Sequence, residues 1–354
     1  MTSAELATTG VHERERPVAA APARADKPCG RRAPDAVRDY LHSLMQDLAE
    51  PDLQTEPVAA AGLPERIFAI QTHREFCYLS RGRAAAFGDS ARRRIAQSLD
   101  RGLPVQYCLD IGGGYHASLR PGAEPLSFGP GLGELLLLRQ IRRLEARVRR
   151  VYRPGLRFSL VIDNLVAWFV NGIPVESTAE YCARLRALIA QSGMSALVDL
   201  WVESEHLTTG DFERLRPAHR VEPCLDALTR KDHETVERFL GRRCDVAEAA
   251  ARAASYREIT AVSTALIDSR IDGLRMTQRA TRETLCFRPV PGADSRIQSG
   301  EVALCTAGHG RVRPLLLTSH NEHLYEWHRI DISAMLPPAI EQVIYADPAV
   351  RAPA

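Results

Sequence analysis

Short apolar runs alternate with longer amphipathic segments through the middle of the chain, and this alternation constrains the fold more than any other feature. The predicted strands are apolar enough to be buried on both faces and span residues 105–111, 157–163 and 196–203. The predicted helices have apolar residues at helical spacing and span residues 91–102, 133–152 and 177–193. Strands that alternate with helices of this length indicate crossover connections. We therefore predict an α/β fold: a doubly wound, mainly parallel Rossmann-like sheet with helices on both faces.

The flanking segments are shorter and more varied. One amphipathic helix is predicted over residues 34–50, and a strand over residues 66–70. Two further helices are predicted over residues 211–216 and within 232–272. The last part of the chain contains shorter strand-like runs, at residues 284–290, 301–306, 313–319 and 328–333. We expect these runs to form an antiparallel C-terminal extension of the same sheet or a small cap.

The domain organisation follows from these segments. Residues 1–34 are rich in Ala, Pro, Arg and Glu and nearly lack large apolar side chains, so we predict a disordered tail there. Residues 35–345 are predicted to form a single α/β catalytic domain, and residues 346–354 a second tail. Within that domain we expect a Rossmann-like core at about 66–205 and a helical and antiparallel part at 206–345.

The charge balance argues against a nucleic-acid-binding protein. Lys plus Arg number 46 and Asp plus Glu 44, so the net charge is only +2. The basic run at 139–150 has no interleaved aromatic residues, and we predict that it is the solvated side of an amphipathic helix. There is neither an apolar run of 18 residues nor an apolar N-terminal signal region. We therefore expect a cytoplasmic protein that binds neither nucleic acid nor membrane.

Several cofactors are disfavoured by residue usage. Only Lys27 and Lys231 are lysines, and both lie in charged or tail segments, which argues against a pyridoxal phosphate enzyme. The eight cysteines include no C-x-x-C pair, which is typical of a reduced intracellular protein without a thiolate zinc site. His320, His323 and His328 match no known zinc signature, and their role is left open. We expect no metal.

Two predicted strand ends carry polar or glycine-rich segments, at 109–118 and 161–164. In open α/β sheets, ligands bind outside the carboxyl ends of the strands. The first segment resembles the opening motif of methyltransferases that use S-adenosylmethionine (SAM). In that motif a strand ends in an acid, here Asp110, and a glycine-rich turn follows, here Gly112, Gly113 and Gly114. Tyr115 would add an aromatic face suited to a sulfonium cation.

A second resemblance covers more of the chain. From about residue 89 to 192, the order of elements is similar to that of the pyoverdine/dityrosine biosynthesis family, whose best-known members are isocyanide synthases. The family's "G-x-P-I", "P-D-x-G-E", "Y-x-P-G" and "S-D-G" motifs correspond here to Gly102–Pro104, Gly131–Glu134, Tyr152–Gly155 and Ile162–Asn164. This resemblance implies a doubly wound fold with its site at the same strand ends.

The sequence departs from the family's motifs at three positions. Ala117 lies where the family's catalytic loop has a lysine, Gly131 replaces the acid of the second motif, and Asn164 replaces the final glycine of the last motif. Losing a lysine removes a charge partner for an anionic substrate group, such as the phosphate of ribulose 5-phosphate. On this basis the sequence favours a SAM-consuming enzyme of small-molecule biosynthesis on an isocyanide-synthase-like fold.

The main hypothesis is that the aminobutyryl arm of SAM cyclises to a strained cyclic amino acid and releases methylthioadenosine. The enzymes that form azetidine-2-carboxylate act in this way, and methyl transfer is the other form of the hypothesis. The reaction needs a deprotonated amine and a cation-tolerant lining. Tyr115, Ser118 and Asn164 would supply this lining, Asp163 or Asp110 would orient the amine, and Glu134 would accept ribose hydroxyls.

Two alternatives stay open from the sequence. One is an isocyanide synthase that acts on an amino acid, and the other is a non-catalytic protein that binds a metabolite. The expected partner is a small-molecule substrate, and a homodimer is left open. The sequence does not distinguish methyl transfer from cyclisation.

Overall fold

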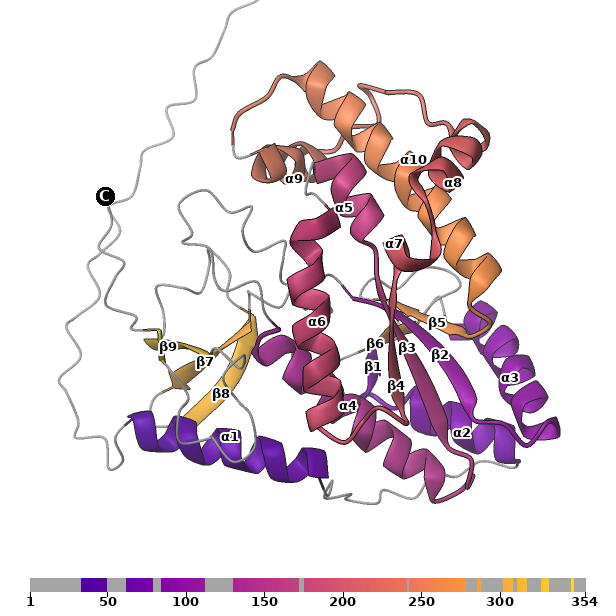
Figure 1. Cartoon of the computed structure of the whole chain (residues 1–354), viewed down its shortest axis with the longest axis vertical. Helices are drawn as coiled ribbons and strands as arrows, with labels where there is room; N and C mark the ends of the chain where they lie inside the picture. The colour runs from indigo at the N-terminus through magenta and orange to yellow at the C-terminus, as the bar shows by residue number, and fades with distance from the viewer. Residues whose placement is uncertain are drawn as a thin grey trace, which may run out of the picture.

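The computed structural model describes the chain over 11 ranges: 33–49, 62–78, 84–111, 130–171, 175–240, 242–277, 285–287, 302–307, 311–316, 326–330 and 345–346. Their helices and strands form a three-layer α/β arrangement with a smaller sheet beside it (Figure 1). The predicted fold class is therefore confirmed.

The central sheet has six strands in the order β1-β6-β5-β2-β3-β4. These are β1 (Cys77–Tyr78), β2 (Val105–Asp110), β3 (Leu156–Ile162), β4 (Val198–Val202), β5 (Leu274–Thr277) and β6 (Leu285–Phe287). All neighbouring pairs are parallel except β1 with β6. The chain passes from β2 through β3 to β4, and β5 then pairs with the opposite edge of β2. Because the direction of winding reverses there, the topological switch point lies between β2 and β5.

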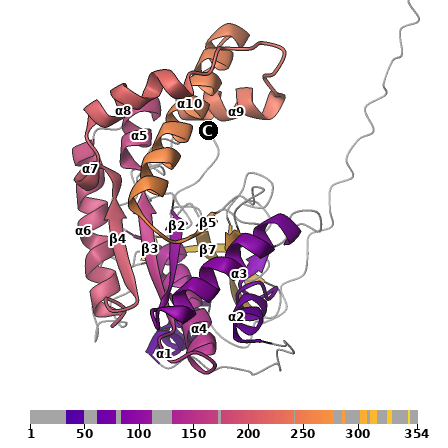
Figure 2. The ribbon, with the colours of Figure 1, turned by 90° about the vertical axis from the view of Figure 1, so that its right-hand side faces the viewer.

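Helices cover both faces of this sheet, as Figures 1 and 2 show. They are α1 (Ala33–Ala49), α2 (Leu63–Gln71), α3 (Ala84–Asp100), α4 (Leu132–Arg149), α5 (Asn164–Asn171), α6 (Val175–Gln191), α7 (Glu203–His206), α8 (Thr209–Leu215), α9 (Arg230–Leu240) and α10 (Val246–Arg270). The longest, α10, leads directly into β5.

Alternating side chains of the strands enter two separate apolar clusters. Cys108, Val161 and Trp201 pack with α5, α8 and α10 on one face. Tyr107 and Leu160, which point the other way, pack with α1, α4 and α6. Successive side chains of a strand point to opposite faces. The continuous apolar runs predicted from the sequence are therefore explained by a sheet that is buried on both faces.

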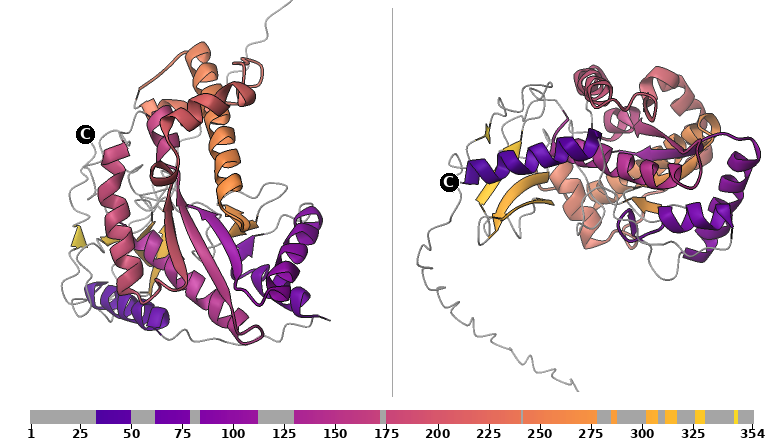
Figure 3. Two further views of the ribbon diagram at one scale, coloured as in Figure 1. Left: turned by 45° about the vertical axis from the view of Figure 1, so that its right-hand side comes forward. Right: turned by 90° about the horizontal axis from the view of Figure 1, so that it is seen from below.

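The other antiparallel strands form a sheet of their own, in the order β10-β9-β7-β8. They are β7 (Val302–Ala307), β8 (Arg311–Leu316), β9 (Glu326–Ile330) and β10 (Tyr345–Ala346). Helix α1 runs alongside this sheet (Figure 3, right). Leu304 of β7 is fully buried and belongs to the same apolar cluster as the leucines of α4. The small sheet thus shares the main core, although it does not extend the central sheet edge to edge.

One predicted strand is wrong. Residues 66–70 lie within the helix α2, not in a strand. Short apolar runs do not distinguish a strand from a buried helix by periodicity alone. The helix-start signals lie just upstream, where Pro64 and Glu65 occupy the first turn after Gly62.

The arginines of α4 differ from the solvated surface that the sequence predicts. Arg143 and Arg147 both pair with the Glu75 carboxylate, at 2.8 and 2.6 Å, and their side chains are largely buried. Arg139, one turn earlier on the same face, pairs with Asp47 of α1. Residues four apart on a helix share a face. These three arginines therefore link α4 to α1 and to the segment before β1.

Candidate active site at the carboxyl edge of the sheet

Three neighbouring parallel strands end in a carboxylate at the same edge of the sheet. Asp110 is the last residue of β2, Asp163 follows β3, and Glu203 follows β4. The register aligns Asp110 with Val161 and Ile162 with Val202, so the three acids lie within about two residues of one another along the strands. This edge also contains the carboxyl end of β2 beside the switch point, where ligands bind in open α/β sheets. Helices α5 and α10 lie at this end of the molecule, at the top of Figure 1.

Asp163 and Asn164 lie at the start of α5. The Asp163 carbonyl oxygen accepts a hydrogen bond from the Ala167 amide (3.2 Å), as expected for an N-cap residue. The carboxylate of Asp163 is half-buried. A short polar side chain is favoured at this position of a helix, and the chemical role of Asp163 stays a prediction.

Asn164 is buried and joins three elements. Its Nδ2 donates to Thr178 Oγ1 (2.9 Å) in α6 and to Ser204 Oγ (2.8 Å) in α7. Its Oδ1 accepts from the Ser204 amide (3.0 Å). These bonds use both amide protons, so the predicted substrate contact would have to come from the remaining lone pair of Oδ1. The role of Asn164 toward a substrate stays a prediction.

Glu203 is fully buried and was missed by the sequence reasoning. Its Oε2 accepts from the Leu165 amide (3.2 Å) at the start of α5, and its Oε1 accepts from Ser263 Oγ of α10. Burial raises its pKa to about 8, with the nearby Asp163 carboxylate adding to the rise and the Ser263 bond opposing it. A carboxyl group with this pKa can hold a proton near neutral pH. Its position as the last residue of the strand predicted over 196–203 was the signal that the sequence offered.

Glu134 lies on α4 and is also buried. Its Oε2 accepts from the Gly131 amide (2.8 Å) and its Oε1 from the Tyr181 hydroxyl (2.6 Å). The first bond caps the helix N-terminus, which favours an acid in the first turn. A ribose contact would have to be added to these two bonds, and it too stays a prediction.

The remaining predicted site residues lie outside the described ranges. These are Gly112, Gly113, Gly114, Tyr115 and Ser118, together with Ala117. Asp110, which precedes them, is half-buried at the end of β2. Of the predicted set, the structure thus brings Asp110, Asp163 and Asn164 to one edge and locates Glu134 in the first turn of the helix that follows β2.

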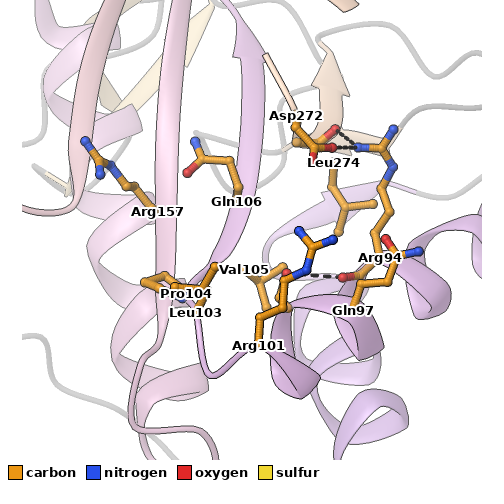
Figure 4. A pocket seen from close by; sticks show the side chains of 12 residues that line it. Arg94, Gln97, Arg101, Leu103, Pro104, Val105, Gln106, Arg157, Asp272 and Leu274 are labelled. Atoms are coloured by element: carbon orange, nitrogen blue, oxygen red, sulfur yellow. Dashed lines mark hydrogen bonds and ion pairs between the residues drawn. The ribbon is translucent and has the colours of Figure 1, made fainter. Parts of the chain in front are cut away.

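An open pocket of about 300 Å³ lies at the opposite edge of the sheet. Arg94 of α3, Arg101 just after that helix, and Arg157 of β3 line it (Figure 4). Arg94 donates to Asp272 Oδ1 (2.9 Å) and to the Gly273 carbonyl oxygen (3.0 Å). The pocket adjoins the amino ends of β2 and β5. Because ligands in this fold class bind at carboxyl ends, we assign the candidate active site to the carboxylate edge instead.

Two other expectations concern metals and membranes. Of the three histidines near the C-terminus, His320 and His323 lie outside the described residues, and His328 lies in β9. Elsewhere in the described chain, His233, Glu237 and Cys244 have ligand atoms within 4.8 Å of one another. No helix in the described ranges is long and apolar enough to cross a membrane.

Comparison with known proteins gives a structural match alone. No family model and no curated protein matches this chain. Among solved structures, it is similar to the crystal structure of the PvcA protein from Pseudomonas aeruginosa, with a TM-score of 0.56 and 17% sequence identity. The match covers 75% of this chain and 95% of that chain. At this identity the likeness shows the fold, and it agrees with the fold that the motif resemblance implied.

Proposed function

We propose that the protein is an enzyme of small-molecule biosynthesis that acts on the amino group of an amino acid, by chemistry of the isocyanide-synthase type. The observation that carries this proposal is the row of acids, Asp110, Asp163 and Glu203, at the ends of adjacent strands. It is supported by the motif resemblance to the pyoverdine/dityrosine biosynthesis family and by a fold similar to that of PvcA.

The acids suit an amine substrate. A carboxylate attracts an ammonium group and can accept its proton once the amine must act as a nucleophile. Asp163 is half-buried, so in this proposal it contacts the amine. Glu203 is fully buried and acts through Asp163 and the start of α5, so we assign it a positioning role. In its protonated form it leaves the neighbouring Asp163 as the charged partner of the substrate.

The second candidate is the SAM-consuming reaction predicted from the sequence. Its specific support is the acid Asp110, which ends β2 beside the switch point as in SAM-dependent methyltransferases. The amino-acid arm of SAM also carries an amine, so the same acids would serve either substrate. The sequence's scarcity of lysine favours this candidate over a sugar phosphate, whereas the motif resemblance favours the isocyanide-type reaction.

One experiment separates these reactions. The purified chain is incubated with the twenty amino acids and ribulose 5-phosphate, and in parallel with SAM alone. Mass spectrometry follows the isocyanide, trapped with a tetrazine, or methylthioadenosine and S-adenosylhomocysteine. The proposal expects the isocyanide adduct from the first mixture. Nucleoside products from the second mixture, without the adduct, would support the SAM reaction instead. Binding by calorimetry without any product would support the non-catalytic alternative.

The acids are tested by matched variants. Asp163→Asn should lower kcat/KM at least 100-fold, because it removes the group that receives the amine proton, a contribution of roughly this size in general base catalysis. Asp226→Asn alters an exposed acid far along the chain and should leave activity unchanged. Equal activity of both variants would contradict the assignment of Asp163.

A further inference from the structure

The connection between α9 and α10 brings together three side chains that the proposed function does not use. His233 and Glu237 are four residues apart on α9 and share one face of that helix. Cys244 lies just before α10. All three side chains are partly buried, and their ligand atoms lie within 4.8 Å of one another.

Their spacing is close to that of a tetrahedral metal site. With bond lengths of about 2.0–2.3 Å to nitrogen, oxygen and sulfur, ligand atoms around zinc lie roughly 3.3–3.8 Å apart. His233 Nε2 and Glu237 Oε1 are already 3.7 Å apart. The upper limit of 4.8 Å for the whole set leaves about 1 Å to be closed by side-chain rotation.

The donor types select among metals. One imidazole nitrogen, one carboxylate oxygen and one thiolate sulfur form a mixed set that suits zinc, whereas calcium and magnesium require oxygen ligands. Glutamate and thiolate together carry two negative charges, which a divalent ion neutralises. Three protein ligands leave a fourth position for water.

The local hydrogen bonds define what the ion must displace. His233 Nε2 lies 2.9 Å from the Cys244 carbonyl oxygen, and the Cys244 amide donates to Glu237 Oε1 (3.3 Å). Arg243 is 3.9 Å from Glu237 but is almost fully exposed, and Arg242 is paired with Glu248. Binding therefore exchanges the histidine contact for a metal bond and releases one weakly held arginine.

We propose that His233, Glu237 and Cys244 form a zinc site that fastens the start of α10 to α9. The consequence is structural: α10, which carries Ser263, packs across one face of the sheet and leads into β5. An ion at this turn would hold the amino end of α10. Among the helices in the described ranges, α10 alone offers Glu203 a side-chain donor, Ser263, whereas α5 offers the backbone amide of Leu165.

Cobalt titration tests the site directly. The full chain, without an affinity tag and after chelation, is titrated with Co²⁺ and monitored by absorption. We expect one equivalent to give a thiolate-to-cobalt charge-transfer band and visible bands of tetrahedral intensity, both displaced by Zn²⁺. Cys244→Ser should abolish the charge-transfer band, and His233→Asn should weaken binding at least tenfold. Cys224→Ser, at an exposed free cysteine, is the matched control and should retain both signals.

Three outcomes would overturn the proposal. The first is the absence of a charge-transfer band in the unmodified chain, and the second is a band that survives Cys244→Ser. The third is a band that is lost in His323→Ala but kept in His233→Asn, which would assign the ion to the C-terminal histidines. Circular dichroism checks that each variant is folded, and zinc should raise the thermal midpoint of the unmodified chain and of Cys224→Ser, but not that of Cys244→Ser.

Discussion

The Glu203 carboxyl group ties the stability of the protein to pH. Its pKa in the folded chain is about 8, above the value of 4.5 for an exposed glutamate, because burial disfavours the charged form. Between these two values the folded chain holds a proton that the unfolded chain has released. The stability that the raised pKa of Glu203 contributes is therefore fully present below pH 4.5, and it is lost as the pH rises to about 8.

The expected result is a falling free energy of unfolding across this window, by up to about 1.4 kcal/mol per pH unit. Glu203→Gln should remove most of this slope, because glutamine keeps the shape and cannot ionise. Urea unfolding at several pH values measures both chains, and Glu205→Gln, an exposed acid two residues later, is the control. A slope that is the same in Glu203→Gln and in the unmodified chain would contradict the assignment.

Glu75 provides a second prediction at the residue scale. It pairs with two largely buried arginines, Arg143 and Arg147, and its backbone carbonyl oxygen accepts from Gln140 Nε2 (2.6 Å). Glu75→Ala would leave both arginines without this partner, which costs about 3–5 kcal/mol for buried pairs and less where water reaches the charges. Glu234→Ala breaks the exposed pair with Arg230 and should cost under about 1 kcal/mol. Denaturant midpoints compare the two, and equal losses would contradict the importance of burial.

At the scale of elements, two of the three described glycines with positive φ give a matched comparison. Gly193 follows α6 with a φ of 65°, and an added Cβ would meet nothing within 4 Å. Gly155 precedes β3 with a φ of 71°, and an added Cβ would lie 2.7 Å from Glu145 Oε1. Glu145 is buried and paired with Arg149, so it has little room to move.

Gly193→Ala should therefore cost only backbone strain, about 1 kcal/mol. Gly155→Ala should cost about 2–3 kcal/mol, because the clash is added to the strain. Thermal or urea unfolding of the two variants measures the difference. If Gly155→Ala were the less destabilising of the two, the close contact with Glu145 would be refuted.

The sequence predicted some helices and strands accurately and others wrongly, for identifiable reasons. Helix α6 and strands β2 and β3 match the predicted segments to within about two residues, because each has a long periodic or apolar pattern with clear ends. Gly193 ends its helix as predicted, and the Met194 amide donates to the Ile189 carbonyl oxygen (3.0 Å) there. The segment at 66–70 failed because a run of four apolar residues fits a helix or a strand equally well.

The candidate site was predicted only in part. The rule that ligands bind at carboxyl ends of strands pointed to Asp110, Asp163 and Asn164, and the structure brings these residues to one edge. The same rule applied to the third strand would have found Glu203. Its contact with Ser263, 60 residues later in the chain, could not be inferred, because nothing in local periodicity indicates which helix covers a strand end.

For the whole molecule, the shared core predicts that both sheets unfold together. Leu304 of the small sheet is fully buried among residues of the main cluster. Leu304→Ala should destabilise the chain by about 2–5 kcal/mol through the lost contacts and the cavity. The chain has three tryptophans, and Trp327→Phe removes the one in the small sheet. The other two, Trp168 in α5 and Trp201 in β4, then report the unfolding of the central sheet by fluorescence.

The midpoint reported by these tryptophans should fall with Leu304→Ala, as should the midpoint from circular dichroism. Leu225→Ala alters an exposed leucine and should leave both midpoints unchanged. A fluorescence midpoint unaffected by Leu304→Ala would show that the small sheet unfolds by itself and would contradict the predicted single domain over residues 35–345.

By itself, the sequence determined the class of fold, because apolar runs and amphipathic spacing are local properties that record which faces are buried. Tertiary structure decided the rest. It places β5 and β6 on the far side of β2, so that strands from beyond residue 205 complete the central sheet. It also turns the α4 arginines toward Asp47 and Glu75 and buries Glu203 beneath α10. These outcomes depend on contacts between residues distant in the chain, whose free energy comes from burial that no local pattern encodes.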